Sequence, residues 1–482
     1  MYKKIANYTK FDETRCYTVF RNFKFILTTW RIIFMNQTKE LGTENIGKLL
    51  FKFSLPAITG MIINALYNIV DRIYIGHIKG VGSSALSGLA ITFPISTIIM
   101  AFGMLIGIGS CSLISIRLGE KNKESADNIL GNALILIAII SLVISLFGVL
   151  FLNKLLILFG ASENSLPYAK SYIQIILMGA VFQNIGFGIN NIIRAEGNPK
   201  TAMFTMLFGG IINIFLDPIF IFIFNMGIQG AAIATIISQA FATLWVLKYF
   251  TSKKSGSLLK LKKSNLKLNI HIIKEIFAIG MAPFSMQVAS SLVIILYNKG
   301  LYNYGGDLAI AAMGILNSIS MLIFMPIFGI SQGIQPIIGY NYGAKLYPRV
   351  LKVLKYAIFT GTCIAIMGFA CVQLFPKLLI NAFISNSPDL TNLGARGLRI
   401  DLMFLPILGF QILGASYFQA INEAKTSMLL SILRQVIVLI PLILILPLFL
   451  NLDGLWFSQP CADLVATGLT AIFLYRSIKK IR

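Results

Sequence analysis

The chain alternates between apolar runs of about twenty residues and short polar segments along most of its length. Runs of this length match the hydrocarbon thickness of a bilayer, so each one predicts a membrane-spanning helix. We expect twelve such helices, over residues 49–75, 90–116, 127–152, 166–194, 201–224, 229–250, 272–303, 308–338, 351–375, 390–419, 426–449 and 454–476. The pattern therefore predicts an all-α integral membrane protein.

Charge placement gives these helices a direction. Of the 482 residues, 56% are apolar and 12% are charged, and the net charge is +23. Lys and Arg gather between the sixth and seventh predicted helices and at alternate helix ends, whereas the opposite ends are poor in them apart from Lys377, Arg396 and Arg399. By the positive-inside rule, we expect a multi-pass protein of the cell inner (cytoplasmic) membrane with both termini cytoplasmic.

The same charge raises the question of a nucleic-acid partner. The basic loops are not interleaved with aromatic residues, which a base-stacking surface needs. We therefore expect the lipid bilayer, and no nucleic acid, as the partner of these loops.

Two internal matches predict a repeat. Residues 195–203 (AEGNPKTAM) match residues 420–428 (AINEAKTSM) at an offset of 225, and GEK at 119–121 matches GAK at 343–345 at an offset of 224. Each copy holds six helices, and because six is even both copies enter the membrane in the same direction. Two parallel lobes related by a pseudo-twofold repeat are expected, with a cavity between them that opens to each side in turn.

The repeat divides the chain into four parts. We expect an N-terminal cytoplasmic extension over 1–45, a first lobe over 46–250, a basic linker over 251–271 and a second lobe over 272–482. In the extension, residues 23–35 are too short to span a bilayer. They are either an interfacial helix or part of a dispensable segment that ends before Met35.

Acidic residues inside the spans are the main candidates for function. Asp71 lies roughly 28 Å and Asp217 roughly 25 Å from the cytoplasmic ends of their helices, at 1.5 Å per residue. Asn213 is one turn from Asp217, and Thr235 enters at a similar depth on the sixth helix. Hard oxygen ligands suit Na⁺, and two buried acids close together also bind protons more tightly. Both Na⁺ and H⁺ remain open as the coupling ion, and a Na⁺ site at these four residues is one of the two interpretations.

The second copy serves as an internal control. The residue that matches Asp71 is Asn298, and the one that matches Asp217 is Ile440, so the second copy has lost the acid pair. This asymmetry indicates that the first lobe handles the ion. The alternative is that Asp71 only pairs with the adjacent Arg72 or snorkels outward.

Other polar residues in the spans are candidates for a substrate cavity. They are Asn64 and Asn68 on the first helix, Gln287 and Asn298 on the seventh, Asp401 on the tenth and Asp463 on the twelfth. Pro56 interrupts the backbone hydrogen bonds of the first helix, which makes it either a hinge or the site of a static kink.

At four places the chain resembles the multidrug and toxic compound extrusion (MATE) transporters, in their DinF/MepA-like branch. The segments are LPAITGMIINALYNIVDRIYIGH, RAEGNPKTAM, INIFLDPIFIF and QGAAIATIISQ. The resemblance implies export of cationic or amphipathic drugs in exchange for H⁺ or Na⁺, by a chain that is no enzyme and needs no other cofactor. We expect a monomer.

The resemblance also implies roles for single residues. The first-helix acid of this branch falls on Asp71, its fifth-helix N-x-x-x-D pair on Asn213 and Asp217, and its sixth-helix threonine on Thr235. NorM-like members place an acid in the seventh helix instead. That helix offers no acid here, so their mechanism is not expected.

Two other classes remain as alternatives. A lipid-linked oligosaccharide flippase of the same superfamily needs a cationic cavity, whereas the charges inside the spans here are mainly acidic. An intramembrane enzyme needs metal-binding or nucleophilic residues. The two histidines, His77 and His271, both lie near loop ends.

Overall fold

The computed structural model describes residues 37–78, 81–159, 161–163, 165–252, 255–383 and 387–481. These residues form helices joined by short connections. The predicted interfacial helix over 23–35, and Lys253 and Lys254 of the linker, lie outside the described residues.

The first half of the chain begins with a short helix and continues with long ones. Its helices are α2 (Gln37–Thr43), α3 (Ile46–Gly76), α4 (Gly82–Gly119), α5 (Lys123–Leu150), α6 (Leu152–Leu158), α7 (Leu166–Met178), α8 (Ala180–Ala195), α9 (Pro199–Pro218), the π-helical η1 (Ile219–Ile223) and α10 (Gly227–Thr251). A 3₁₀ turn, η2 (Lys263–Asn265), follows in the linker.

The second half repeats this order. Its helices are α11 (Ile270–Gly343), α12 (Tyr347–Leu374), α13 (Pro376–Asn381), α14 (Pro388–Asp401), α15 (Leu405–Ala420), α16 (Ala424–Ile432), the π-helical η3 (Leu433–Leu439), α17 (Ile440–Ile445) and α18 (Pro447–Ile481). Two long helices contain breaks, at Gly306 (φ 62°) in α11 and at Asn451 (φ 51°) in α18.

The predicted membrane-spanning architecture is confirmed. In the described residues, ten helices are long and apolar enough to span a bilayer, and two bent pairs bring the number to twelve. The bends, 55° between α7 and α8 and 50° between α14 and α15, were not predicted. The start of α4 was also predicted too late, at residue 90 instead of Gly82, because the segment GSSALSGL is rich in small and polar residues.

Backbone conformation supports the repeat independently of sequence identity. Left-handed residues occur in three pairs: Lys121 and Lys345, Gly197 and Asn422, and Asn225 and Asn451. The differences in residue number within these pairs are 224, 225 and 226. Left-handed φ is uncommon for residues other than Gly, so its recurrence at one spacing is specific. The GEK and GAK motifs match because both turns use a lysine in this conformation.

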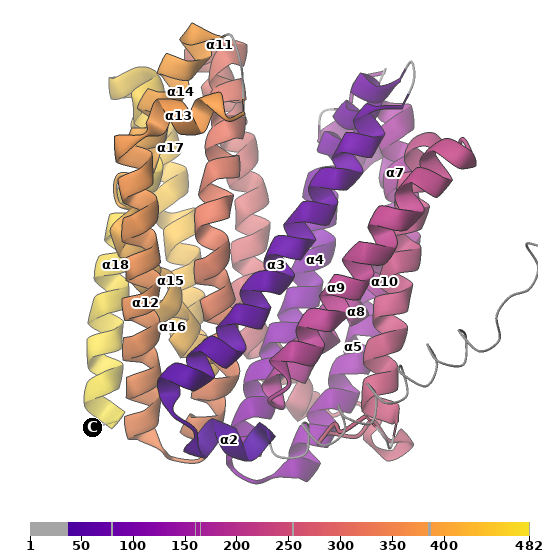
Figure 1. The fold of residues 1–482 in the computed structure, drawn as a ribbon, viewed down its shortest axis with the longest axis vertical. Coiled ribbons are helices and arrows are strands. Elements are labelled where there is room, and N and C mark those ends of the chain that lie inside the picture. Colours follow the sequence, from indigo (N-terminus) through magenta and orange to yellow (C-terminus); the bar gives the residue numbers. More distant parts are fainter. Residues whose placement is uncertain are drawn as a thin grey trace, which may run out of the picture.

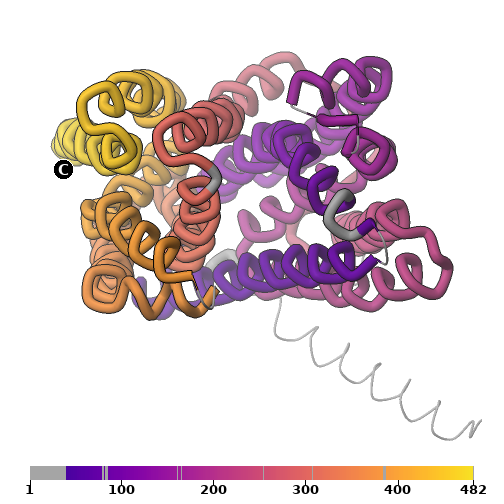
Figure 2. Tube along the Cα trace, turned by 90° about the horizontal axis from the view of Figure 1, so that it is seen from above, coloured from indigo at the N-terminus to yellow at the C-terminus, as the bar shows by residue number. Residues whose placement is uncertain are grey.

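The two halves lie side by side and meet at one end (Figures 1 and 2). We call this the closed end; it contains α2 and the GEK and GAK turns, and the helices of the two halves diverge toward the opposite end (Figure 1). The first helix, α3, starts beneath the second half and crosses to the first half on its way up (Figure 1).

Each half packs the beginning of its first long helix against the other half. Leu49 and Phe53 of α3 belong to a buried cluster with Ile334 of α11. In the same way, Ile276 at the start of α11 belongs to a cluster with Leu105 of α4. The two lobes are therefore interlocked at the closed end by their first helices.

Glycines allow the closest backbone contacts at the closed end. A Cβ atom on Gly119 would lie 2.1 Å from the carbonyl oxygen of Tyr340, and a Cβ on Gly343 would lie 2.1 Å from the carbonyl oxygen of Ile116. Only glycine permits this separation, because real Cβ contacts are almost never shorter than 3.0 Å. The two glycines are the first residues of GEK and GAK, so the repeat places them symmetrically across the interface.

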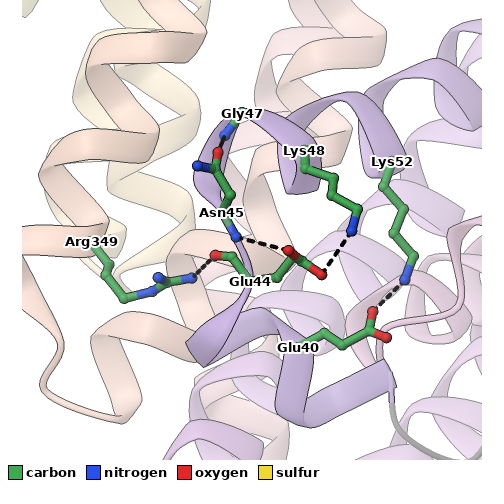
Figure 3. A network of polar contacts seen from close by, with 7 residues as sticks. All are labelled: Glu40, Glu44, Asn45, Gly47, Lys48, Lys52 and Arg349. Atoms are coloured by element: carbon green, nitrogen blue, oxygen red, sulfur yellow. Dashed lines mark hydrogen bonds and ion pairs between the residues drawn. The ribbon is translucent and has the colours of Figure 1, made fainter.

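Polar contacts also join the halves at the closed end (Figure 3). The Arg349 guanidinium on α12 donates to the backbone oxygens of Glu44, at 2.7 Å, and Leu41, at 3.2 Å. Its Nε donates to Asn341 at 3.0 Å. Lys48 pairs with Glu44 at 3.2 Å, so the turn between α2 and α3 is held from both sides (Figure 3).

The linker packs on the first half. The backbone N–H of Lys260 donates to Asp127 on α5 at 2.8 Å, and that of Leu259 donates to Glu196 at 3.1 Å. Burial raises the pKa of the Glu196 carboxyl, while hydrogen bonds from Tyr249, Leu259 and Ser257 act in the opposite direction. These contacts tie the linker to the first half up to the start of α11.

Candidate functional site

Asp71 lies in the upper part of α3, where that helix packs against α9. Its side chain is only 6% exposed, and its Oδ1 atom has no hydrogen-bond partner. The Arg72 side chain is exposed, and no ion pair in the described part of the chain joins the two residues. This arrangement gives no support to the alternative in which Asp71 only pairs with Arg72.

Asp217 and Asn213 lie one turn apart on α9, as their spacing predicts. Asn213 Nδ2 donates to Asp217 Oδ1 at 3.0 Å and lies 3.5 Å from the Thr235 hydroxyl on α10. Gly230 lets α10 approach this region, since a Cβ there would lie 2.7 Å from the backbone of Phe220. The structure therefore brings together three of the four residues expected to bind the ion.

Buried oxygens without donors mark this cluster. They are Asp71 Oδ1, Asp217 Oδ2 and Asn213 Oδ1. The carboxylates of Asp71 and Asp217 also lie close enough to interact electrostatically. Buried polar atoms in native proteins nearly always have a partner, so these three oxygens on neighbouring helices can accept hydrogen bonds or bind a cation. A proton or a hard cation can satisfy them.

Two tyrosines near the acids were not identified from the sequence. The hydroxyls of Tyr67 on α3 and Tyr172 on α7 lie within electrostatic range of both Asp71 and Asp217. Tyr67 was detectable, because it precedes Asp71 by four residues and so shares its face of the helix. Nothing in the sequence indicates that α7 brings Tyr172 to the same place.

Asn64 and Asn68, the two first-helix candidates for a substrate cavity, bond to each other. Asn68 Nδ2 donates to the backbone oxygen of Asn64 at 2.6 Å and to its side-chain oxygen at 3.1 Å. Asn68 is exposed, and Asn64 is half-buried. The pair bonds within its own helix rather than to the acid cluster.

The second half contains a cavity of about 200 Å³ that is lined by polar residues. It brings together three residues that the sequence singled out: Asn298, Asp401 and Asp463. Asp401 is buried, and its Oδ1 atom has no partner. Asn298, the counterpart of Asp71 in the repeat, therefore lies beside two acids supplied by other helices, α14 and α18.

One of these two acids is neutralised by an arginine that the sequence analysis overlooked. Arg434 Nε donates to Asp463 Oδ1 at 2.7 Å, and Gln459 lies 3.4 Å from the same oxygen. Arg434 stands inside an apolar run just as Asp71 does, so the same criterion identifies it. With Arg434 counted, the acids of this cavity carry one net negative charge.

Two further predicted residues lie apart from these clusters. Gln287 is half-buried on α11 and does not line the cavity. Pro56 is buried within α3, which continues as one helix through it, so its role as a hinge stays a prediction.

Comparison with known proteins places these features in a family context. The model of the MatE family matches residues 56–219 and 281–445. The multidrug export protein MepA of Staphylococcus haemolyticus is 28% identical over 439 residues, covering 90% of this chain and 94% of MepA. MepA of Staphylococcus aureus is 26% identical, covering 89% of this chain and 93% of MepA.

Solved structures of MATE transporters are similar to this chain in fold. The MATE multidrug transporter DinF-BH, in complex with rhodamine 6G, has a TM-score of 0.84 and 40% identity, covering 91% of this chain and 98% of DinF-BH. An outward-facing multidrug resistance MATE transporter of the MOP superfamily has a TM-score of 0.87 and 26% identity, covering 92% of this chain and 99% of its own.

Proposed function

The chain belongs to the MatE family of membrane transporters, and from this membership we propose that it is a multidrug efflux antiporter coupled to H⁺ or Na⁺. The proposed substrates are cationic or amphipathic drugs. Relatives named as multidrug exporters over 90% and 89% of the chain support the substrate class. No enzymatic activity belongs to this function.

One observation carries the coupling assignment: the buried, unpartnered oxygens of Asp71, Asp217 and Asn213. A buried carboxylate without a counter-charge costs several kcal/mol, so this acid pair favours uptake of a cation. Either H⁺ on a carboxylate or Na⁺ among the oxygens lowers that cost. Thr235 supplies a further neutral ligand from α10.

Alternating access supplies the transport step. The halves meet at the closed end, and the Lys and Arg residues of the linker favour a cytoplasmic position for this end. The described arrangement then corresponds to an outward-facing state, consistent with its likeness to an outward-facing MATE transporter. Opening to the cytoplasm requires the contacts of Gly119 and Gly343 to separate.

The available energy is sufficient. One charge that crosses about 150 mV supplies about 3.5 kcal/mol. That energy supports roughly 300-fold accumulation of a neutral drug. Exchange of one monovalent ion for one monovalent drug cation is electroneutral and uses only the ion's concentration gradient.

The charges at the 200 Å³ cavity of the second half favour export of cations over flipping of a lipid-linked pyrophosphate. Asp401 and Asp463 outnumber the single Arg434 there, and a pyrophosphate needs the opposite sign. We therefore retain the exporter and not the flippase.

The test compares three variants in proteoliposomes that contain rhodamine 6G. Asp71→Asn and Asp217→Asn keep side-chain shape but remove the charge, and each should abolish drug movement driven by an imposed H⁺ or Na⁺ gradient. Asn298→Ala, at the repeat counterpart of Asp71, is the comparison: since Asn298 lines the cavity of the second half, this variant should change drug affinity mildly at most and should still respond to the imposed ion gradient. Applying the two gradients separately identifies the ion.

Drug binding to the purified protein completes the test. Asp71→Asn should still bind rhodamine 6G, but the affinity should no longer depend on pH or Na⁺. Uphill transport by Asp71→Asn under an imposed gradient would show that coupling lies elsewhere, with Asp401 as the next residue to examine.

A further inference from the structure

A cavity of about 550 Å³ in the second half is lined by residues of α12, α13 and α14. The helices α13 and α14 lie at the end of the molecule remote from α2 (Figure 1). The cavity lies where α12 ends, between α13 and α14. Because α12 is a membrane-spanning helix that ends at Leu374, the cleft sits at the level where a bilayer's hydrocarbon gives way to headgroups.

Three of its lining residues are basic: Lys377, Arg396 and Arg399. They are the same three residues that depart from the charge pattern of this end of the molecule. Arg396 pairs with Asp453, whereas no ion pair in the described residues involves Lys377 or Arg399. Three positive charges and one negative charge leave the cleft with a net charge of +2.

Arg399 is held in place by reciprocal hydrogen bonds. Its Nη2 atom donates to the Gln373 backbone oxygen at 3.2 Å, and Gln373 Nε2 donates to the Arg399 backbone oxygen at 3.0 Å. The guanidinium is thus fixed against the last turn of α12, with further N–H groups available to a ligand. A planar, pre-positioned guanidinium suits a phosphate group.

Three of the other lining residues are apolar and exposed. Leu374, Phe375 and Leu378 are 69%, 56% and 67% exposed. Basic groups beside an apolar surface fit a molecule with an anionic head and a hydrocarbon tail. A free inorganic phosphate would use only the basic part.

The repeat shows that the scaffold does not need the two arginines. Residues 154–157 and 377–380 both read KLLI, at a difference of 223, and both lie in short helices, α6 and α13. The helix that follows α6 is α7, whose sequence LPYAKSYIQIILM contains no arginine. The arginine pair is therefore a feature of the second copy alone.

We propose that this cleft binds an anionic glycerophospholipid, with its phosphate at Lys377 and Arg399 and its acyl chains along Leu374, Phe375 and Leu378. This lipid site is separate from the ion and drug sites and does not depend on the proposed antiport. The lipid site and the drug cavity share the helix α14. Arg399 lies two residues before Asp401 on α14, so a bound lipid holds the helix that carries the cavity acid.

The experiment uses the purified full chain in detergent and measures its melting temperature and its retained lipids by native mass spectrometry. Phosphatidylglycerol should raise the melting temperature and remain bound, while phosphatidylcholine of equal chain length should do neither. Inorganic phosphate and glycerol phosphate, which lack acyl chains, should have little effect.

Lys377→Glu reverses one charge without breaking a hydrogen bond described in the structure, and Lys377→Gln/Arg399→Gln removes two. Each should weaken phosphatidylglycerol binding at least about tenfold. Lys154→Glu, at the repeat counterpart of Lys377, is the matched control and should bind as the unaltered protein does. Because Arg399 also anchors α12, Lys377→Glu decides the matter if the double variant folds poorly.

Two outcomes would overturn the proposal. One is equal binding of phosphatidylglycerol and phosphatidylcholine by the unaltered protein. The other is a loss of phosphatidylglycerol affinity in Lys377→Glu that is no greater than the loss in Lys154→Glu.

Discussion

Alanine at Gly119 or Gly343 should shift the protein away from the arrangement in which the two halves meet at the closed end. Each substitution adds a Cβ atom 2.1 Å from a backbone carbonyl oxygen of the opposite half. Ordinary contact begins at 3.4 Å, so the two helices must separate locally by about 1.3 Å, the difference between these values. Backbone cannot rotate out of the way as a side chain can.

The energy of that separation sets the size of the effect. Overpacking a close contact costs about 1–3 kcal/mol. This cost arises only in the state in which the two halves meet at the closed end. The gain in helix propensity from Gly to Ala is present both in that state and in the state in which the halves have separated. The ratio of open to closed molecules should therefore rise roughly 5- to 150-fold.

Spin labels can measure this ratio directly. Cysteines at Glu124 and Lys352 place labels on exposed positions of α5 and α12 near the closed end, in a background without the native cysteines. Pulsed electron paramagnetic resonance should then show a longer distance between the two labels, as a new or larger population, in Gly119→Ala and Gly343→Ala. Gly314→Ala and Gly468→Ala are the controls, because a Cβ there meets nothing within 4 Å.

The reasoning fails if the distance distributions of Gly119→Ala and Gly468→Ala are the same. It also fails if Gly119→Ala changes the distribution and Gly343→Ala does not, because the repeat places both glycines in equivalent contacts.

Three further predictions address other parts of the molecule. Arg349→Gln should cost about 1–3 kcal/mol at the turn between α2 and α3 and speed amide hydrogen exchange over residues 41–48, whereas Lys352→Gln on the same helix should not. Arg434→Leu should lower the melting temperature more than the double variant Arg434→Leu/Asp463→Leu, because the single change leaves a buried carboxylate unpaired. Deletion of residues 1–34 should leave membrane insertion and drug efflux unchanged, since the predicted lobes begin beyond them; poor insertion would contradict this.

Local spacing predicted part of the candidate site well. Asn213 and Asp217 are four residues apart on a helix, and the structure joins them by a hydrogen bond. This prediction rests on helix geometry alone, which depends little on how helices pack.

Contacts between helices that are distant in the sequence were harder to predict. Tyr172 lies on α7, and no sequence pattern marked either its place near the acids or the 55° bend between α7 and α8. The packing of Leu49 and Phe53 against the second half was equally hidden. An apolar helix in a membrane has apolar neighbours on every side, so hydrophobic periodicity does not reveal which helix it contacts.

The charges in the two halves support different proposed roles for them. Near Asp71 and Asp217, no basic side chain forms an ion pair with either acid among the described residues, and full ionisation would leave a buried charge of −2. In the second half, Arg434 offsets Asp463, so that Asp401 alone needs a cation. A site of −2 gains most from binding a proton or Na⁺, because each added positive charge also relieves the repulsion between the acids. A site of −1 inside a 200 Å³ cavity is balanced by one ammonium group of a drug. We therefore expect drug cations to protect Asp401, and coupling ions to protect Asp71, from carboxyl-modifying reagents, and the reverse pattern would exchange the two assignments.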